Sequence, residues 1–237
     1  MPEPGRFQNL MGYLRSHRRV FEKYVDLKIL SGFLLSAVFL WIFGGITEEV
    51  LEKDTVVDDL LMDLMGRVRT PLLTSVMIFI TNMGDPLLIW AGTIVFVSLL
   101  LHFKKFEQAI LVTWTMVGGG VLNQVLKVSI HRSRPPGTSL VEAWGWSYPS
   151  GHAMMSVLFY LSLGFFLMRR TRQPAGKAAI IITFAAIPIL IALSRIYLQV
   201  HYLSDAAAGL FGGLFWFAVC VTTLLFFRKR SEWKSGD

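Results

Sequence analysis

Long apolar stretches, separated by short polar segments, dominate the chain. They cover Ile29–Ile46, Pro71–Phe103, Ala109–Leu126, His152–Met168, Ala178–Leu193 and Ala206–Phe227. A helix needs about 20 predominantly apolar residues to span a lipid bilayer, and five of these stretches are close to that length. The pattern therefore predicts an all-α, polytopic membrane protein.

The stretch Pro71–Phe103 is too long for one span and too short for two spans with a loop between them. The polar sequence TNMGDP, residues 81–86, interrupts it. We therefore expect Leu87–Phe103 to span the membrane and Pro71–Met83 to form a partly inserted helix that leads into it. The resulting prediction is a six-transmembrane-helix bundle.

Basic residues are distributed unevenly between the two sides that this topology defines. Sixteen of the 23 Lys and Arg residues lie in the two terminal segments and in the turns 104–108 and 169–177. Because loops rich in Lys and Arg stay in the cytoplasm, we expect cytoplasmic segments at 1–28 and 228–237 on either side of a membrane domain, 29–227. The net charge of +7 is thus a topology signal and does not indicate nucleic-acid binding.

The segment 47–83 falls on the extracytoplasmic side in this topology. Residues 47–70 carry seven Asp and Glu residues, and apolar residues recur there at helical spacing, at Val56, Leu60, Leu61 and Leu64. This pattern predicts an amphipathic helix at the outer membrane surface, so that 47–83 is an interfacial helical segment. Its acidic residues are compatible with gating a site, binding cations or simply connecting two spans.

Composition narrows the chemistry that the chain can carry. Hydrophobic residues make up 54% of it and charged residues only 16%, against about 25% charged in soluble domains. The single cysteine, Cys220, lies in an apolar run, so it forms neither an intrachain disulfide nor a cysteine cluster, and we interpret it as a packing residue. We predict no metal site and no cofactor.

Ionisable and polar residues at the ends of the predicted spans form three groups, in the sequences KVSIHRSRPP, PSGH and SRIYLQVHYLSD. Their candidate functional residues are Lys127 and Arg134, then Ser150, Gly151 and His152, then Arg195, His201 and Asp205. The predicted topology places all three groups at the outer ends of their helices. Since ionisable residues near membrane spans are costly and usually functional, we expect one extracytoplasmic site.

The cations and the helix start among these residues suit a phosphate. Lys127, Arg134 and Arg195 supply three cations, and the fork of an Arg side chain matches the oxygens of a phosphate. Ser150 and Gly151 begin a helix, where backbone N–H groups are free to bind an anion. Taken separately, these motifs have simpler explanations as a helix cap and snorkelling cations.

The histidines suit catalysis. His201 and Asp205 are spaced i, i+4, so both lie on one face if this segment is helical. Asp205 then holds one ring nitrogen of His201 and leaves the other free to attack. His152 is a second imidazole, suited to protonate a leaving oxygen. Together on one face of the membrane, the three groups favour a catalytic site.

The motifs resemble those of the type 2 phosphatidic acid phosphatase (PAP2) superfamily, the lipid phosphate phosphatases. The family pattern is Lys-x6-Arg-Pro, Pro-Ser-Gly-His and Ser-Arg-x5-His-x3-Asp, and it is present without departure at Lys127–Pro135, Pro149–His152 and Ser194–Asp205. The resemblance implies metal-independent hydrolysis of a phosphomonoester or diphosphate through a phosphohistidine. It implies His201 as the nucleophile, Asp205 as its orienting residue and His152 as the acid. The phosphate-binding residues that it implies are Lys127, Arg134, Ser150, Gly151 and Arg195.

A site at the outer end of the bundle suits a lipid whose headgroup lies at the membrane surface. We expect undecaprenyl diphosphate, phosphatidylglycerol phosphate or phosphatidate as substrate in a bacterial-type member, membrane lipids as partners and no nucleic acid. Trp144, Trp146 and Tyr148 are expected to anchor the protein at the interface or to line the lipid entrance. Two alternatives stay open: a lipid phosphotransferase that uses the same phosphohistidine, and a non-catalytic anion-binding or transport protein.

Overall fold

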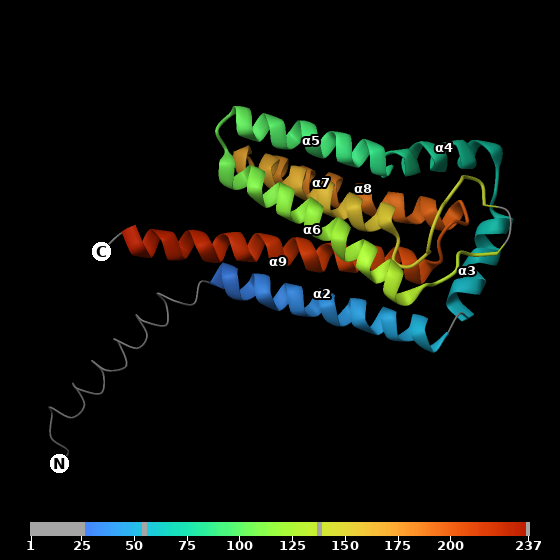
Figure 1. The fold of residues 1–237 in the computed structure, drawn as a ribbon. Helices are drawn as coiled ribbons and strands as arrows, with labels where there is room; N and C mark the ends of the chain where they lie inside the picture. The colour runs from blue at the N-terminus through green and yellow to red at the C-terminus, as the bar shows by residue number, and fades with distance from the viewer. Residues whose placement is uncertain (1–26, 54–55, 137–138, 236–237) are drawn as a thin grey trace, which may run out of the picture.

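The computed structural model describes residues 27–53, 56–136 and 139–235, and the regular structure within them is entirely helical (Figure 1). The helices are α2 (Leu27–Glu52), α3 (Val56–Arg67), α4 (Pro71–Asn82), α5 (Pro86–His102), α6 (Phe106–Ile130), α7 (Gly151–Arg170), α8 (Pro174–Tyr197) and α9 (Leu203–Ser235). The all-α prediction is confirmed. Residues 1–26 of the expected cytoplasmic segment 1–28, and residues 236–237 of the expected tail, lie outside the described residues.

Within the described residues, six helical units are long and apolar enough to span a bilayer, as the hydrophobic pattern predicts. They are Leu27–Glu52, Pro71–His102, Phe106–Ile130, Gly151–Arg170, Pro174–Tyr197 and Leu203–Arg230. The protein is thus an integral, multi-pass membrane protein. The first boundary differs from the prediction, because α2 continues past Ile46 to Glu52. Residues 47–52 contain no Pro or Gly to end the helix, so they belong to α2 and not to a separate interfacial segment.

The expected interruption between Pro71 and Phe103 is present and has a local cause. α4 ends at Asn82, and the Asp85 carboxylate caps the start of α5 by accepting hydrogen bonds from the N–H groups of Leu87 at 2.8 Å and Leu88 at 3.3 Å. Pro86 follows as the first residue of α5, a position that proline favours. The two helices therefore lie end to end, α4 on the side of α3 and α5 on the side of α6 (Figure 1).

Helix α9 lies in the bundle against α2, α6, α7 and α8. Glycines permit its close approach to the start of α7: a Cβ at Gly209 would lie 2.6 Å from the carbonyl oxygen of Ser150, and one at Gly213 would lie 3.0 Å from that of Met154. This packing holds the second and third motifs together. Cys220, farther along α9, is buried with a free thiol, which confirms its interpretation as a packing residue.

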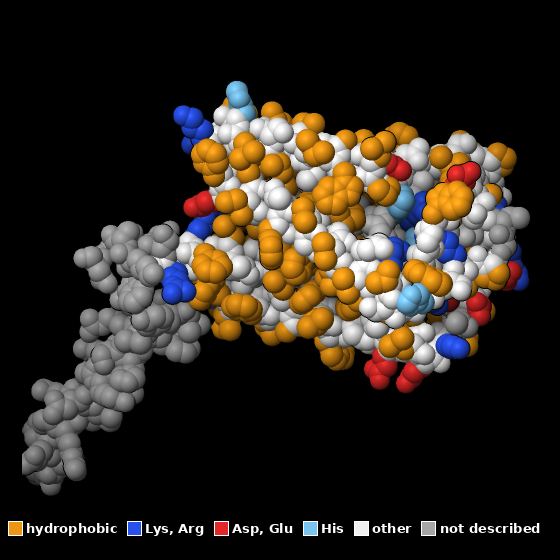
Figure 2. Space-filling model, in the orientation of Figure 1, with side chains coloured by type: hydrophobic (Ala, Val, Ile, Leu, Met, Phe, Trp, Pro, Cys, Tyr) orange, Lys and Arg blue, Asp and Glu red, His pale blue; other side chains and the backbone are white. Residues whose placement is uncertain are grey.

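The described chain begins and ends at one end of the bundle, and the three motif segments lie at the other (Figure 1). Apolar side chains cover the middle of the molecule, while most charged side chains gather toward the two ends (Figure 2). The number of spans explains this arrangement, because an even number of crossings returns the chain to the side where it started. The site and the two ends of the described chain thus lie at opposite ends of the bundle, separated by the length of its helices.

The predicted amphipathic helix is present as α3, and the residue that it buries most deeply is a carboxylate. The apolar residues Val56, Leu60 and Leu64 are exposed, whereas Asp58 is only 4% exposed. Leu61 packs against the cluster around Ala153 on α7. The helix therefore leaves most of its apolar stripe on the outside and directs one carboxylate into the protein.

Candidate active site

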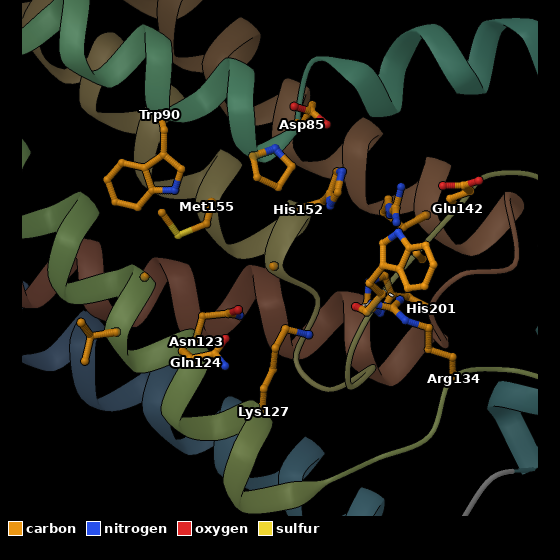
Figure 3. Close-up of a pocket in the computed structure, with 18 of the residues that line it drawn as sticks. Asp85, Trp90, Asn123, Gln124, Lys127, Arg134, Glu142, His152, Met155 and His201 are labelled. Carbon is orange, nitrogen blue, oxygen red and sulfur yellow. Dashed lines mark hydrogen bonds between the residues drawn. The ribbon is translucent and has the colours of Figure 1, made fainter.

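The three motifs meet in one cavity of about 750 Å³, at the end of the bundle where α6 and α8 end and α7 begins. The predicted site residues that line it are Lys127, Arg134, Gly151, His152, Arg195 and His201. Lys127, His152, Arg134 and His201 surround the polar part of the cavity (Figure 3). The segments lie far apart in the sequence, so their convergence depends on the fold.

His201 lies in the turn between α8 and α9 and is almost completely buried. Its Nδ1 is 3.2 Å from Ser147 Oγ and 3.5 Å from Asp205 Oδ2. Because Ser147 donates its hydroxyl hydrogen to Asp205, its oxygen accepts from an N–H group at Nδ1. On the other side of the ring, Nη1 of Arg134 lies 3.3 Å from Nε2 and can only donate. Both contacts therefore place the hydrogen on Nδ1 and a lone pair on Nε2.

The charge state of His201 agrees with this tautomer. Burial lowers the pKa of His201 to about 4, and the nearby Asp205 only partly opposes that effect. The ring is therefore uncharged at neutral pH. A neutral imidazole whose Nε2 lone pair faces a cavity is suited to nucleophilic attack.

Asp205 is the third residue of α9 and is fully buried. Its Oδ2 accepts a hydrogen bond from the backbone N–H of Tyr202 at 2.9 Å, so the carboxylate caps the start of the helix. His201 and Asp205 do not share one helix face, because α9 begins only at Leu203 and the segment between them is not all helical. The carboxylate instead reaches back across the turn to the His201 ring.

Two residues of this site, Ser147 and Arg132, were not identified from the sequence as functional. Ser147 is fully buried, and its backbone N–H donates to the carbonyl of Arg132 at 2.8 Å. Arg132 in turn donates from Nη1 to Asp205 Oδ1 at 2.7 Å. Their one signal in the sequence is closeness to the motifs: Arg132 precedes Arg134 by two residues, and Ser147 precedes Ser150 by three.

Lys127 and Arg134 hold the loop between α6 and α7 in addition to lining the cavity. Lys127 Nζ donates to the carbonyl of Trp146 at 2.6 Å, and Arg134 Nη2 donates to that of Trp144 at 2.8 Å. The left-handed residue His131 ends α6 and starts this loop. Since both cations donate to neutral carbonyls, their charge is available to an anion in the cavity.

Arg195 differs from these two cations because it is deeply buried. Its Nη1 donates to Thr81 Oγ1 at 2.9 Å, across to α4. Its Nε is buried and has no hydrogen-bond partner within the described part of the chain. An unpaired buried donor is costly, and an anion in the adjoining cavity would supply the missing acceptor.

At the start of α7, the first backbone N–H available to the cavity belongs to Gly151 and not to Ser150. Ser150 caps the helix, its Oγ accepting from the N–H of Ala153 at 3.5 Å, but its own N–H donates to the carbonyl of Asp205 at 2.9 Å. The expectation of a free N–H at Ser150 is therefore wrong. Gly151 lines the cavity, where a Cβ would lie 3.3 Å from Asn123 Oδ1. The first N–H of a helix has no partner within the helix, so Gly151 carries the available donor.

The remaining predicted residues separate into two groups. His152 projects into the cavity from the first turn of α7 (Figure 3). Trp144 lines the cavity and is 84% exposed. Tyr148, by contrast, is fully buried, with its hydroxyl 2.7 Å from Thr47 Oγ1 on α2. Burial raises the pKa of Tyr148 to about 12. Tyr148 is a core residue, and the expectation that it anchors the protein or lines a lipid entrance is wrong.

The cavity also has an apolar end. Trp90 and Met155 lie at the end opposite Arg134 and His201 (Figure 3). Val117 and Val121, on α6, line the same region and are about half exposed on the outer surface of the bundle. The polar site is thus continuous with an apolar surface that faces the lipid side of the helices.

The fold and this site define a multi-pass helical membrane protein with a cavity lined by Lys and Arg side chains between its helix ends. Residues 108–229, just over half of the chain, match the PAP2 superfamily. The chain belongs to the PAP2 superfamily. This agrees with the resemblance seen in the three motifs.

Individual relatives are phosphatases. The chain is 28% identical over 183 residues to phosphatidylglycerophosphatase B of Bacillus subtilis (strain 168), covering 76% of this chain and 90% of the relative. It also resembles the crystal structure of a transmembrane PAP2-type phosphatidylglycerolphosphate phosphatase from Bacillus subtilis, with a TM-score of 0.63 and 26% identity over 89% of this chain and 98% of that one. Aquifex aeolicus LpxE shares the fold, with a TM-score of 0.55 and 21% identity over 71% and 97% of the two chains. The chain is therefore a phosphatase of the PAP2 type.

Proposed function

We propose that this protein hydrolyses the terminal phosphate of a membrane lipid phosphomonoester or diphosphate through a phosphohistidine at His201. The orientation of His201 carries the proposal. Its Nδ1 faces Ser147 and Asp205, and its Nε2 faces the cavity that the cations line. An imidazole held in this way has its nucleophilic atom directed at the place where a phosphoryl group would bind.

The first step forms the phosphoenzyme. The Nε2 lone pair of His201 attacks phosphorus, the bond from phosphorus to the leaving oxygen breaks, and protonated His152 gives that oxygen its proton. The ring of His201 becomes positive, and the Asp205 carboxylate stabilises it. The transferred phosphoryl oxygens are bound by the side chains of Lys127, Arg134 and Arg195 and by the N–H of Gly151. Ser150, which is fully buried, holds the start of α7 in place behind Gly151.

The second step releases the product. A water molecule attacks phosphorus, and His152, now neutral, accepts its proton. The bond from phosphorus to Nε2 breaks, its electron pair returns to the His201 ring, and inorganic phosphate leaves. The cations stabilise the charge of both transition states, and they are held in place before the substrate arrives, which favours electrostatic catalysis.

The apolar end of the cavity favours a lipid over a soluble phosphate ester. A lipid headgroup would reach the cations while its tail lies along α5 and α6, beside Trp90 and Val121. We put phosphatidylglycerol phosphate first among the candidate substrates, because the Bacillus subtilis relatives are named as phosphatases of that lipid. Undecaprenyl diphosphate and phosphatidate offer the same combination of phosphate and apolar tail.

Phosphate release from the purified protein tests this proposal. In detergent and EDTA, without an acceptor lipid, we expect inorganic phosphate from phosphatidylglycerol phosphate, undecaprenyl diphosphate or phosphatidate. A requirement for an acceptor lipid would instead indicate a phosphotransferase, and binding without turnover would indicate an anion-binding protein. Loss of activity in EDTA would contradict the proposed metal-independent mechanism.

A substitution at Gly120 distinguishes lipid binding from phosphate binding. A Cβ there would lie 3.3 Å from the Trp90 ring and 3.9 Å from Met155 Cε, so Gly120→Leu fills the apolar end of the cavity. We expect kcat/KM to fall at least about tenfold for lipid substrates, the cost of roughly 1.4 kcal/mol of transition-state binding, and to change less than about twofold for 4-nitrophenyl phosphate. Gly45→Leu, where a Cβ meets nothing within 4 Å, is the matched control. Equal losses on both substrates would show that the apolar end does not bind the tail.

We propose that the site faces the extracytoplasmic side and both termini the cytoplasm. Basic residues of the turns and of the end of α9 support this, because Lys104, Lys105, Arg169, Arg170 and Arg228 all lie at the end of the bundle away from the site. With Cys220 replaced by serine, a cysteine at Ser139 should react with a membrane-impermeant maleimide in intact cells. A cysteine at Lys104 should react only after permeabilisation, and the reverse pattern would place the site in the cytoplasm.

A further inference from the structure

Asp58 is the one described acidic residue of the 47–70 segment that is buried. It lies in the first turn of α3, outside the three motifs. Its Oδ2 accepts from Arg132 Nη2 at 2.7 Å, and its Oδ1 accepts from the backbone N–H of Ser204 at 3.0 Å. The Ser204 hydroxyl also donates to Asp58, at 2.5 Å. Burying a charge is costly unless it is paired and hydrogen-bonded. The partners of Asp58 meet this requirement and fix the position of its carboxylate.

Arg132 connects Asp58 to the catalytic turn. One guanidinium nitrogen, Nη2, contacts Asp58, while the other, Nη1, donates to Asp205 at 2.7 Å and to the Ser204 hydroxyl at 2.6 Å. The guanidinium also lies over the ring of Tyr202, 4.3 Å from its centroid. The planar fork of Arg132 is thereby held from both sides and from one face, which defines its position.

Arg132 by itself would weaken the effect of Asp205 on His201. A cation 2.7 Å from the carboxylate neutralises part of the negative charge that must stabilise a positive His201 ring. A second carboxylate on the far side of the guanidinium offsets that cation. Burial makes the balance matter, because interactions between charges are stronger in a low-dielectric interior. Burial lowers the pKa of Arg132, but Asp205 and Asp58 raise it by more, so the guanidinium stays charged.

We propose that Asp58 is a positioning residue for phosphoryl transfer: it holds Arg132 and balances its charge, so that Asp205 stays in place and negative behind His201. This inference rests on the proposed roles of His201 and Asp205. It gives the segment between α2 and α4 a function other than gating the cavity or binding cations. Asp58 itself does not line the cavity, so its effect on the reaction passes through Arg132 and Asp205.

Asp58→Asn is the main test, because it removes the charge and keeps the shape. We expect kcat to fall about tenfold, in the range of coupling between residues of one buried network, and KM to stay within about twofold. Asp63→Asn is the matched control: Asp63 lies on the same helix and forms an exposed ion pair with Arg67 at 2.5 Å. Such a pair contributes little, so we expect kcat of the control to equal that of the unchanged protein.

A double substitution separates this role from a structural one. In an Asp205→Asn background, Asp58→Asn should lower kcat by less than about a further twofold, because the residue through which Asp58 acts is already altered. Full additivity of the two effects would overturn the proposal, since loss of folding stability does not depend on Asp205. An unchanged kcat in Asp58→Asn would overturn it as well.

Two further variants cover the case in which Asp58→Asn does not fold. Ser204→Ala removes the hydroxyl that bridges Asp58 and Arg132, and Arg132→Lys keeps the charge but loses the fork. Each should lower kcat at least about threefold with KM within about twofold, and an unchanged kcat in both overturns the proposal. His201→Ala, measured in parallel, tells the two proposals apart. If that variant is active, the proposed nucleophile is wrong; if it is inactive while the Asp58 variant is normal, only the role of Asp58 is wrong.

Discussion

Replacing His201 with alanine is expected to lower kcat for every lipid substrate by at least about 10⁴-fold, the scale on which hydrolases lose activity with their nucleophile. The physical reason is the geometry of the ring, whose Nε2 lone pair faces the cavity while Ser147 and Asp205 occupy the other nitrogen. Phosphate binding should largely persist, because the cations of the cavity are unchanged. The measurement is phosphate release at saturating substrate, together with binding of inorganic phosphate.

His102→Ala is the matched control for this substitution. His102 is the last residue of α5, exposed, and at the end of the bundle away from the site. Its loss should leave kcat within about twofold of the unchanged protein, since an exposed residue away from the site has little effect. Activity in His201→Ala comparable to the control would mean that phosphorus is attacked by something other than His201.

His152→Ala is expected to have an effect that depends on the leaving group. Loss of a general acid or base typically costs 10²–10⁴-fold in rate, and we expect a loss of about 10³-fold for a lipid phosphomonoester, whose alkoxide leaving group needs a proton. For 4-nitrophenyl phosphate the first step needs no acid. The variant should therefore release 4-nitrophenol in a rapid burst and then turn over slowly, because His152 is also the base for the second step.

Pre-steady-state kinetics with the two substrates measure this difference. A burst of 4-nitrophenol close to one equivalent of enzyme, followed by slow phosphate release, is the expected result. An identical loss of the first step on both substrates would contradict the assignment of His152 as the acid and would indicate that it binds the phosphate instead.

The six spans were predictable from the sequence because lipid imposes a simple rule: an apolar run of sufficient length must be a helix that satisfies its own backbone. The break before Pro86 was predictable for a similarly local reason, since TNMGDP contains both a capping Asp and a Pro. The burial of a carboxylate by α3 was not predictable. Its apolar spacing indicated an amphipathic helix, but the partner of Asp58 is Arg132, a residue 74 positions away that only the fold brings near.

In the site, too, features set by local sequence were predictable, and contacts between residues far apart in the sequence were not. Topology brought Lys127, His152 and His201 to one end of the bundle, and the cavity includes all three. Ser147 was missed because its partner Asp205 lies 58 residues away, and a serine beside a motif is unremarkable in sequence. Whether His201 lies in a helix stayed open in the sequence, because spacing alone does not say where α9 begins. The bond from the Ser150 N–H to the carbonyl of Asp205 depends on the packing of α7 against α9, which no single segment encodes.

Detection of a phosphoryl group on His201 is the most direct test of whether His201 is the nucleophile. The His152→Ala variant should accumulate the intermediate when it is mixed with 4-nitrophenyl phosphate and quenched in alkali, conditions that preserve phosphohistidine. Mass spectrometry should find one phosphoryl group, on the peptide that contains His201, and should find none in the variant that lacks both histidines. A phosphoryl group on another residue, or a burst of 4-nitrophenol with no phosphorylated peptide, would contradict nucleophilic catalysis by His201.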